Sequence, residues 1–224
     1  EEIPEGLIKP FDVNKDLYYT LDIEDGCVRE IQINPEEPGI QNLSLNIYII
    51  ERELLISQIS AAFVRGYVYF ERDILAPQLD KLNVRGYKFG GYIARISSIK
   101  SYFDENMKLL DEENLDALFG GNHIYTKIRD DNPTRYIKGA KAKNIMAADG
   151  CIIEGEVENS VLFRGVRVGK GAKVKNCVLM QDTVIEPGVN VEYIISDKNV
   201  TITADKEIKG TDSFPVYVAK YQVV

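Results

Sequence analysis

A six-residue repeat in the last third of the chain constrains the fold more than any other feature. From Cys151 onward, small or apolar residues recur at every sixth position in two registers: Ser160, Val166, Ala172, Val178 and Val184, and Leu162, Val168, Val174 and Met180. After a one-residue slip near Pro187 the repeat continues to Val200. A period of six fits neither a helix nor a hairpin, but it fits a solenoid with three flat faces per coil. The repeat therefore predicts a left-handed parallel β-helix.

The same repeat predicts how the coils are built. Small or polar turn residues separate the apolar positions: Gly165, Gly169, Gly171, Asn176, Asp182 and Gly188. We expect roughly three coils, with Val166, Val174 and Val178 pointing into the prism. The stretch "GKGAKV" (169–174) has the wrong spacing for a phosphate-binding P-loop and fits the repeat, so it is interpreted as turn chemistry. The open ends and edges of such a prism usually need a cap or a partner chain.

The first ~118 residues mix strand and helix patterns. The turn signal Glu24-Asp25-Gly26 predicts a hairpin, and Ser97 and Ser98 predict the start of a helix. The expected elements are a hairpin over 16–35, a buried strand and helix over 43–59, a helical stretch over 69–83, a strand over 87–96 and a long helix over 98–119, ended by Gly120-Gly121.

A polar, partly basic stretch separates these two parts. We divide the chain into a mixed α/β part (1–119), a connector (120–145) and the β-helix domain (146–224). The Lys and Arg residues of the connector are interpreted as those of a solvated linker, with an anion site near a domain junction as the alternative.

Composition narrows the function classes. The 224 residues carry a net charge of −8 with a pI near 4.9, which argues against nucleic acid or an anionic membrane as partner. No apolar run approaches the roughly 20 residues of a membrane span, and no signal peptide pattern opens the chain. Cys27, Cys151 and Cys177 lack CxxC spacing, which indicates reduced thiols in a cytosolic protein. The single histidine, His123, argues against a zinc site and against an acyltransferase that needs a histidine base on the β-helix.

Four stretches carry a resemblance to a known family: "SLNIYII" (44–50), "FERDILAP" (70–77), "SYFDENMKLL" (101–110) and "CIIEGEVENSVLFRGVRVGKGAKVKNCVLMQDTVIEPG" (151–188). Their order resembles the C-terminal portion of ADP-glucose pyrophosphorylase (glucose-1-phosphate adenylyltransferase), most of all the GlgD-type subunits of bacterial glycogen synthesis. The resemblance implies an α/β, Rossmann-like nucleotidyltransferase portion followed by a left-handed β-helix. Enzymes of this family join ATP and glucose 1-phosphate into ADP-glucose and pyrophosphate.

Two departures from the family pattern point to lost catalysis. The family's "FVEKP" corresponds to "IQINP" (31–35), so Ile33 and Asn34 replace a glutamate and the lysine that faces the sugar phosphate. Asparagine brings no charge, and isoleucine cannot accept a hydroxyl. The family's "WRDVGT" corresponds to "IARISS" (93–98), so Arg95 replaces an aspartate that resembles a Mg²⁺ ligand. A guanidinium has no acceptor and repels Mg²⁺, although Arg95 could equally pair with an acidic neighbour in the vacated site.

Two polar positions of the sugar site are retained. Ser44 and Tyr48 match the family's "SMGIYVF", so they are the vestigial substrate-binding candidates, with Tyr48 equally readable as core. Asn46 replaces the glycine of that motif and puts a side chain where a ligand would approach. The family's "GGxGxRL" nucleotide loop has no counterpart, so residues 1–118 are expected to form only half of a nucleotide site.

The resemblance therefore implies a regulatory, non-catalytic subunit without catalytic residues, metal ligands or cofactors of its own. Its expected partner is a catalytic ADP-glucose pyrophosphorylase subunit that uses Mg²⁺, in a cytoplasmic heterotetramer, with a homo-oligomer as the alternative. The competing functions are an active glucose-1-phosphate adenylyltransferase and, from another class, a hexapeptide acyltransferase or a scaffold.

Overall fold

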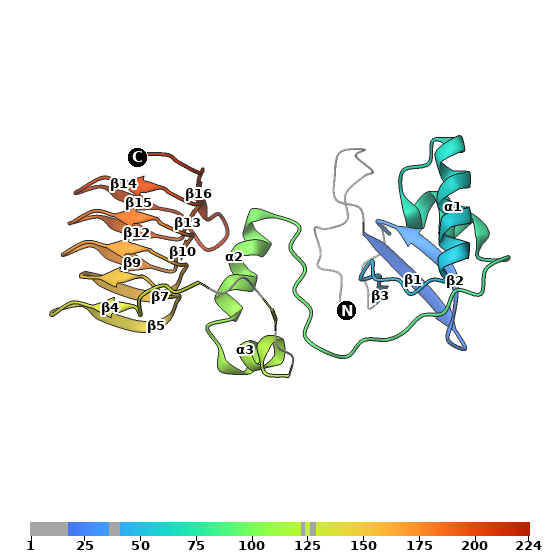
Figure 1. The fold of residues 1–224 in the computed structure, drawn as a ribbon, viewed down its shortest axis with the longest axis horizontal. Coiled ribbons are helices and arrows are strands. Elements are labelled where there is room, and N and C mark those ends of the chain that lie inside the picture. Colours follow the sequence, from blue (N-terminus) through green and yellow to red (C-terminus); the bar gives the residue numbers. More distant parts are fainter. Residues whose placement is uncertain (1–17, 36–40, 122–123, 126–128) are drawn as a thin grey trace. The chain divides into compact units, whose positions relative to one another are not determined.

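The computed structural model describes residues 18–35, 41–121, 124–125 and 129–224. These residues form two compact units that divide between Gly90 and Gly91 (Figure 1). The sequence placed a border at residue 119, whereas the second unit also contains helices α2 (Ile99–Lys108) and α3 (Glu112–Phe119). The reason is that α2 packs against the solenoid, as described below.

The first unit contains an antiparallel sheet in the order β2-β1-β3. Its strands are β1 (Tyr19–Glu24), β2 (Cys27–Ile33) and β3 (Asn42–Leu43). The β1–β2 turn places Asp25 and Gly26 at φ 51° and 77°, the left-handed conformations that favour Asp-Gly in a tight hairpin. The predicted hairpin is confirmed.

Helical segments follow the sheet. They are α1 (Arg52–Arg65), a π-helical turn (Phe70–Leu75) and a 3₁₀ turn (Ala76–Gln78) that contains Pro77. Helix α1 ends at Gly66, whose φ of 71° allows its N–H to bond back to the last turn. The helical predictions for this unit are therefore confirmed in outline.

Apart from Leu43 in β3, the strand predicted at the start of 43–59 and the strand predicted over 87–96 do not form. Neither segment is assigned to a strand: Asn46 has a left-handed φ of 57° in the first, Ile47 is 80% exposed, Tyr87 is 90% exposed, and Ile49 is wholly exposed. An extended segment becomes a strand only when a neighbouring strand supplies backbone partners. Within the described ranges no strand does so for either segment, and these residues do not build a Rossmann-like sheet.

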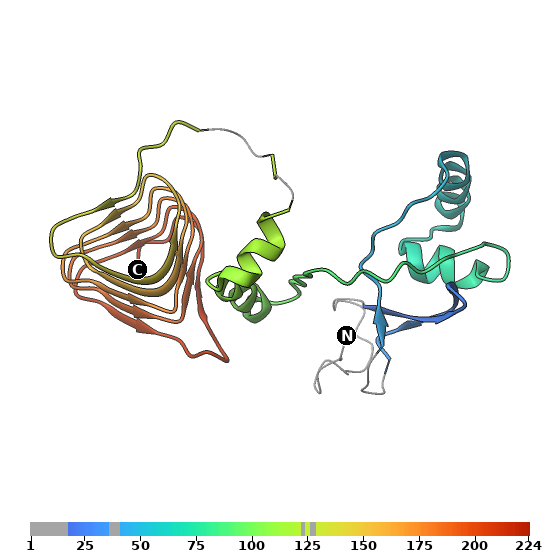
Figure 2. The same ribbon diagram turned by 90° about the horizontal axis from the view of Figure 1, so that it is seen from below.

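The second unit contains a β-solenoid of about four turns. Seen along its axis in Figure 2, each coil has a three-sided outline. All strand pairs between coils are parallel. One of the three faces, the third face, consists of β4 (Arg135–Tyr136), β6 (Ile152–Ile153), β8 (Arg167–Val168), β11 (Val184–Ile185) and β14 (Thr201–Ile202).

The other two faces share the long strands β5 (Lys141–Ala147) and β7 (Glu156–Leu162), which bend from one face to the next. The charged face consists of the first halves of these strands with β9 (Lys173–Lys175), β12 (Asn190–Glu192) and β15 (Glu207–Lys209). The helix-covered face consists of their second halves with β10 (Val178–Leu179), β13 (Ile194–Ser196) and β16 (Val216–Val218).

The coil repeat is shorter than three times six. Lys173 pairs with Asn190, and Asn190 pairs with Glu207, a spacing of 17 residues in both cases. The missing residue is at the corner between the charged and helix-covered faces, where Val174 and Cys177 both point inward. The slip expected near Pro187 is therefore misplaced: the spacing from Ile185 to Val191 is a full six residues, and the short step falls between Val191 and Ile194, as it does between Val174 and Cys177 one coil earlier.

This short corner corrects one predicted core residue. Val166 and Val174 lie in the interior column, as predicted. Val178 does not: it belongs to a second cluster outside the prism, with Phe103 of α2 and Ile195 of β13. Because Cys177 is already the inward residue after the short corner, Val178 is turned outward.

The corners are built from residues that accept a left-handed backbone. Asn159 and Asn176 have φ 43° and 51° at the short corner, and Gly165 and Asp182 have φ 71° and 58° at the next. Asn, Asp and Gly are the residues that adopt this conformation at low cost. The polar turn residues noted in the sequence are therefore confirmed as corners.

The solenoid begins earlier than predicted, which accounts for the additional coil. Strands β4 and β5 lie mostly within the segment interpreted as a connector. The outward residues of the first half of β5 are Lys141 and Lys143, so this strand shows no apolar repeat. The first coil was consequently hidden from a search for apolar spacing.

Two columns of charge run along the charged face. One column alternates strictly from coil to coil: Lys143, Glu158, Lys175, Glu192 and Lys209. Its first pair lies 2.9 Å apart between Lys143 Nζ and Glu158 Oε1, and in the neighbouring column Lys141 Nζ lies 2.7 Å from Glu156 Oε1. These pairs are solvent-exposed, so each contributes little to stability.

Helix α2 packs on the helix-covered face of the solenoid (Figures 1 and 2). Ser98 caps it: Ser98 Oγ accepts from Ser101 N at 3.0 Å, and Ser101 Oγ accepts from Ser98 N at 2.8 Å. The predicted cap is confirmed, but the single helix expected over 98–119 is two helices, because Asp111 caps α3 separately.

Candidate functional site

Asn34 and Ser44 meet at the start of β1. The backbone N–H of Asn34 donates to the carbonyl oxygen of Tyr18 at 3.0 Å, and that of Ser44 donates to the carbonyl oxygen of Tyr19 at 2.9 Å. The structure thus brings together two of the residues singled out from the sequence, through strands that flank β1 on either side.

The side chain of Asn34 is engaged in closing the hairpin. Its Oδ1 accepts a hydrogen bond from the backbone N–H of Tyr18 at 2.9 Å, and its φ is 45°. Asparagine tolerates this left-handed conformation, whereas lysine does not favour it and has no acceptor to offer. At this position the local backbone is suited to asparagine rather than to a phosphate-binding lysine.

Replacing Asn34 with Lys is expected to lower the free energy of unfolding of the first unit by about 1–2 kcal/mol, because it adds left-handed strain and removes one hydrogen bond. Urea denaturation followed by far-UV circular dichroism measures the change. Asn34→Asp is the matched control, since aspartate keeps the acceptor and tolerates the conformation. Equal stability of the Lys and Asp variants would contradict the role of the side chain.

Ser44 and Asn46 form a small polar turn. The N–H of Asn46 donates to Ser44 Oγ at 3.2 Å, and Ser44 Oγ donates to Asn46 Oδ1 at 3.3 Å. Asn46 has φ 57°, a conformation that glycine and asparagine share. Asparagine in place of the family's glycine is therefore compatible with the backbone conformation here. That the Asn46 side chain excludes a ligand stays a prediction.

Tyr48 joins a second polar group that the sequence did not single out. Its hydroxyl donates to the carboxylate of Glu71, and its ring packs on Phe70 with centroids 5.1 Å apart. Glu71 is 7% exposed, and burial raises the pKa of its carboxyl. The helical spacing of Glu71 from Ile74 and Leu75, which are also buried, was the signal that could have identified it.

A cavity of about 310 Å³ lies beside this pair. Tyr48, Phe70 and Gln58 line it together with apolar residues of α1 and the π-helical turn. Tyr48 is 38% exposed, so it is a wall residue of the cavity rather than a member of the buried core. The arrangement offers a largely apolar wall that includes Tyr48, whose hydroxyl binds the buried Glu71 carboxyl.

An ion pair braces the start of the π-helical turn. Arg72 Nε lies 2.6 Å from Asp73 Oδ1, and the guanidinium lies 4.3 Å from the centre of the Tyr69 ring. Asp73 Oδ2 accepts from the N–H groups of Val68 and Tyr69 at 2.9 Å. The hydrogen bond from Arg72, followed by those two N–H groups, holds the pKa of the Asp73 carboxyl well below its usual range.

Arg95 belongs to the second unit, in the extended segment that leads into α2, and is half-buried. Among the described residues no three His, Cys, Asp or Glu side chains form a group that could hold a metal ion. His123 lies outside the described residues. No helix in the described ranges is both long enough and apolar enough to span a lipid bilayer.

The cysteines are free thiols, as predicted. Cys151 and Cys177 are fully buried in the solenoid. Burial raises the pKa of Cys177 to about 12, which keeps it protonated and unreactive at neutral pH.

Comparison with known proteins places these features in context. The family model "GlmU-like, C-terminal hexapeptide" matches residues 128–214. The glycogen biosynthesis protein GlgD of Bacillus subtilis is 39% identical over 178 residues, which are 79% of this chain and 52% of that protein. GlgD of Geobacillus stearothermophilus is 53% identical over 70 residues, covering 31% of this chain and 20% of that protein.

A glucose-1-phosphate adenylyltransferase of Clostridium perfringens is 33% identical over 173 residues, covering 73% of this chain and 42% of that protein. The chain thus spans about half the length of the curated relatives it matches. Over the span that it shares with them, the chain belongs to the family of GlgD and the glucose-1-phosphate adenylyltransferases.

Proposed function

We propose that this chain is part of a regulatory, non-catalytic subunit of ADP-glucose pyrophosphorylase and acts in glycogen biosynthesis. The names of its relatives, glycogen biosynthesis protein GlgD and glucose-1-phosphate adenylyltransferase, supply the pathway and the reaction. The observation that carries the non-catalytic role is Asn34, whose side chain and left-handed backbone are committed to the hairpin with Tyr18.

The chemistry of the reaction explains why this matters. Transfer of an adenylyl group to glucose 1-phosphate needs a cation against the sugar phosphate and oxygen ligands for Mg²⁺. Asn34 supplies no cation, and Arg95 supplies a cation where the metal needs a carboxylate. A positive unit charge ~4 Å from Mg²⁺ is repelled by several kcal/mol at an effective dielectric constant of ~20. Mg²⁺ therefore belongs to the catalytic partner in this proposal.

We further propose that residues 18–96 are a portion of a Rossmann-like nucleotidyltransferase domain. The segments 44–50 and 87–96 carry exposed apolar side chains, among them Ile47, Ile49 and Tyr87. Strands of a parallel sheet are apolar on both faces because helices cover them. These two segments have that composition and are suited to pair within a larger sheet.

A working adenylyltransferase is the second candidate. It is favoured by the retained Ser44 and Tyr48 and by the cavity beside Tyr48. Against it stand the replacement of the lysine and of the aspartate. A hexapeptide acyltransferase is disfavoured because the sequence holds no histidine after His123 to act as base.

The two candidates are separated by turnover and co-purification. The full-length protein is expressed with and without a catalytic homologue from the same organism, and pyrophosphate release is measured with ATP, glucose 1-phosphate and Mg²⁺. We expect no turnover by the protein alone, stable co-purification as a cytoplasmic heterotetramer, and a changed apparent affinity or rate in the complex. Turnover by the protein alone that Ser44→Ala or Tyr48→Phe abolishes would establish the second candidate instead.

A further inference from the structure

The segment that carries Arg95 is attached to α2 at both of its ends. The Tyr92 hydroxyl donates to Glu105 Oε2 at 3.1 Å, and the N–H of Ser97 donates to Ser101 Oγ at 2.9 Å. Arg95 lies between these two attachments. Its backbone therefore follows α2.

Helix α2 is in turn seated on the helix-covered face of the solenoid. Phe103 is 2% exposed, and its partners Val178 and Ile195 are 0% and 2% exposed. Tyr102 and Met107 pack around this cluster. Burial of three large apolar side chains makes this contact the main attachment of the helix.

The solenoid departs from its own repeat where it meets α2. The short corner holds Asn144, Asn159 and Asn176 in three successive coils, but the next coil has Tyr193 there, at φ 52°. An aromatic residue in this conformation is strained. The Tyr193 ring lies 6.0 Å from the Phe103 ring between centroids, so the strained residue is one that contacts the helix.

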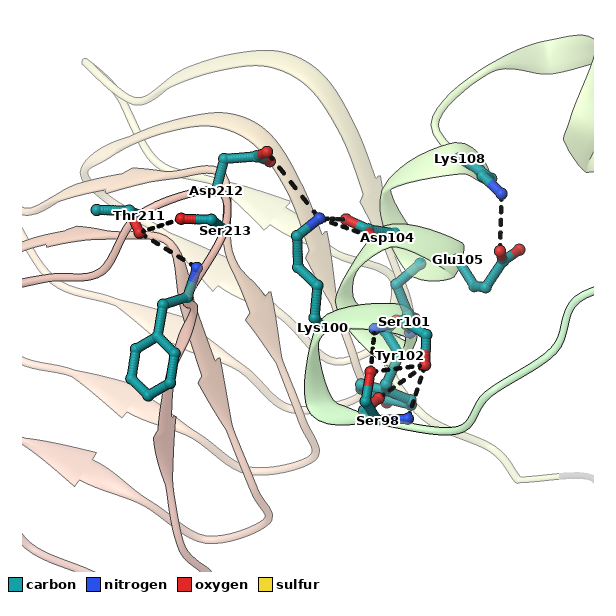
Figure 3. A network of polar contacts seen from close by, with 12 residues as sticks. Ser98, Lys100, Ser101, Tyr102, Asp104, Glu105, Lys108, Thr211, Asp212 and Ser213 are labelled. Atoms are coloured by element: carbon teal, nitrogen blue, oxygen red, sulfur yellow. Dashed lines mark hydrogen bonds and ion pairs between the residues drawn. The ribbon is translucent and has the colours of Figure 1, made fainter. Parts of the chain in front are cut away.

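A second departure lies in the last coil. Val178 pairs with Ile195 after 17 residues, but Ile195 pairs with Tyr217 only after 22. The longer coil carries a loop whose Asp212 lies 4.0 Å from Lys100 Nζ, while Lys100 also contacts Asp104 at 2.5 Å (Figure 3). Being exposed, this pair adds little stability, but it places the additional loop against α2.

We propose that α2 couples the solenoid to the Arg95 segment, so that residues 92–110 move with the solenoid and whatever binds the solenoid repositions Arg95. The boundary at Gly90 and Gly91 separates this body from the first unit. The coupling deepens the proposed regulatory function, on which it rests, because it links the solenoid to Arg95. The coupling of α2 to the solenoid and to the Arg95 segment lies within this chain and does not need a partner.

The test uses a spin label at Ala94→Cys, next to Arg95, in a full-length chain whose other accessible cysteines, Cys27 among them, are replaced by Ser. Cys151 and Cys177 are 0% exposed and do not compete for the label. Electron paramagnetic resonance reports the mobility of the label, and hydrogen exchange reports the protection of α2. We expect an immobile label in this parent. In Ile195→Ala the label becomes mobile and exchange in α2 rises about tenfold or more.

Val184→Ala is the matched control on the solenoid. Val184 is half-buried on the third face and lies outside the Phe103 cluster, so its variant is expected to leave the label and α2 unchanged. Phe103→Ala repeats the test from the helix side, without altering the solenoid. A label already mobile in the parent, or one released equally by Val184→Ala, would overturn the coupling. Neither outcome depends on turnover or on a catalytic partner, so a failure here is distinct from a failure of the proposed function.

Discussion

Replacing Val174 with Asp is expected to unfold the solenoid or to lower its free energy of unfolding by about 4 kcal/mol or more. Val174 is 1% exposed and lies in the apolar interior column between Val157 and Val191 of the neighbouring coils. A carboxylate there has no cation and no hydrogen-bond donor to replace its lost hydration. The measurement is the thermal and urea unfolding of the full chain.

The matched control is Val184→Asp, which introduces the same side chain at a half-buried outward position. Its effect on unfolding is expected to stay within about 1 kcal/mol, because water still reaches the carboxylate. If both variants lost a similar amount of unfolding free energy, the assignment of Val174 to the interior column would be wrong. Soluble expression of each variant at low temperature keeps the comparison possible if Val174→Asp unfolds at 37 °C.

Gly155→Ala is expected to cost about 3 kcal/mol, through a collision between adjacent coils. A Cβ at this position would lie 2.4 Å from the carbonyl oxygen of Ala172 and 2.7 Å from that of Gly169. The Ala172 carbonyl accepts the N–H of Glu156 at 2.8 Å, so moving it breaks a bond between the coils. Both obstacles are backbone atoms, and neither can rotate away.

Gly121→Ala in the same unit is the control for Gly155→Ala. A Cβ there would meet no atom within 4 Å, and its φ is not positive. Its effect on the unfolding midpoint is expected to be near zero, as for most open surface positions. If Gly155→Ala were tolerated as well as Gly121→Ala, the coils would be spaced more widely than the structure indicates.

Local signals in the sequence predicted local structure well. The turn at Asp25-Gly26, the cap at Ser98 and the polar corners of the solenoid all depend on residues close together in the chain. Their conformations follow from backbone preferences alone. The inward positions up to Val174 also followed from the repeat, since every such position faces the same column.

Features that depend on distant partners could not be predicted. The outward turn of Val178 required knowledge of the short corner at Asn176, which an apolar count cannot show. The segments 44–50 and 87–96 have the composition of strands, but composition does not supply a neighbour to pair with. In the same way the spacing of Phe103 predicted an apolar helix face without indicating that the solenoid covers it.

The candidate site was predicted by correspondence of motifs rather than by geometry. That route identified Asn34, Arg95, Ser44 and Tyr48, but it could not show that Asn34 closes the hairpin through Tyr18. It also missed Glu71, which lies inside the quoted stretch "FERDILAP" but was given no role there, although its carboxylate accepts the Tyr48 hydroxyl. Both depend on contacts between strands or helices far apart in the sequence.

The alternating column from Lys143 to Lys209 has a consequence for how the chain finds its fold. Successive coils have similar sequences, so a strand could dock on the coil after next instead of on its neighbour. Such a skipped coil would place Lys143 beside Lys175 and Glu158 beside Glu192, and like charges directly opposite one another are destabilising. Correct winding instead brings opposite charges together at every step of this column. The column thus disfavours the incorrect pairing of coils during folding. Its small contribution to the stability of the folded state would not reveal this role.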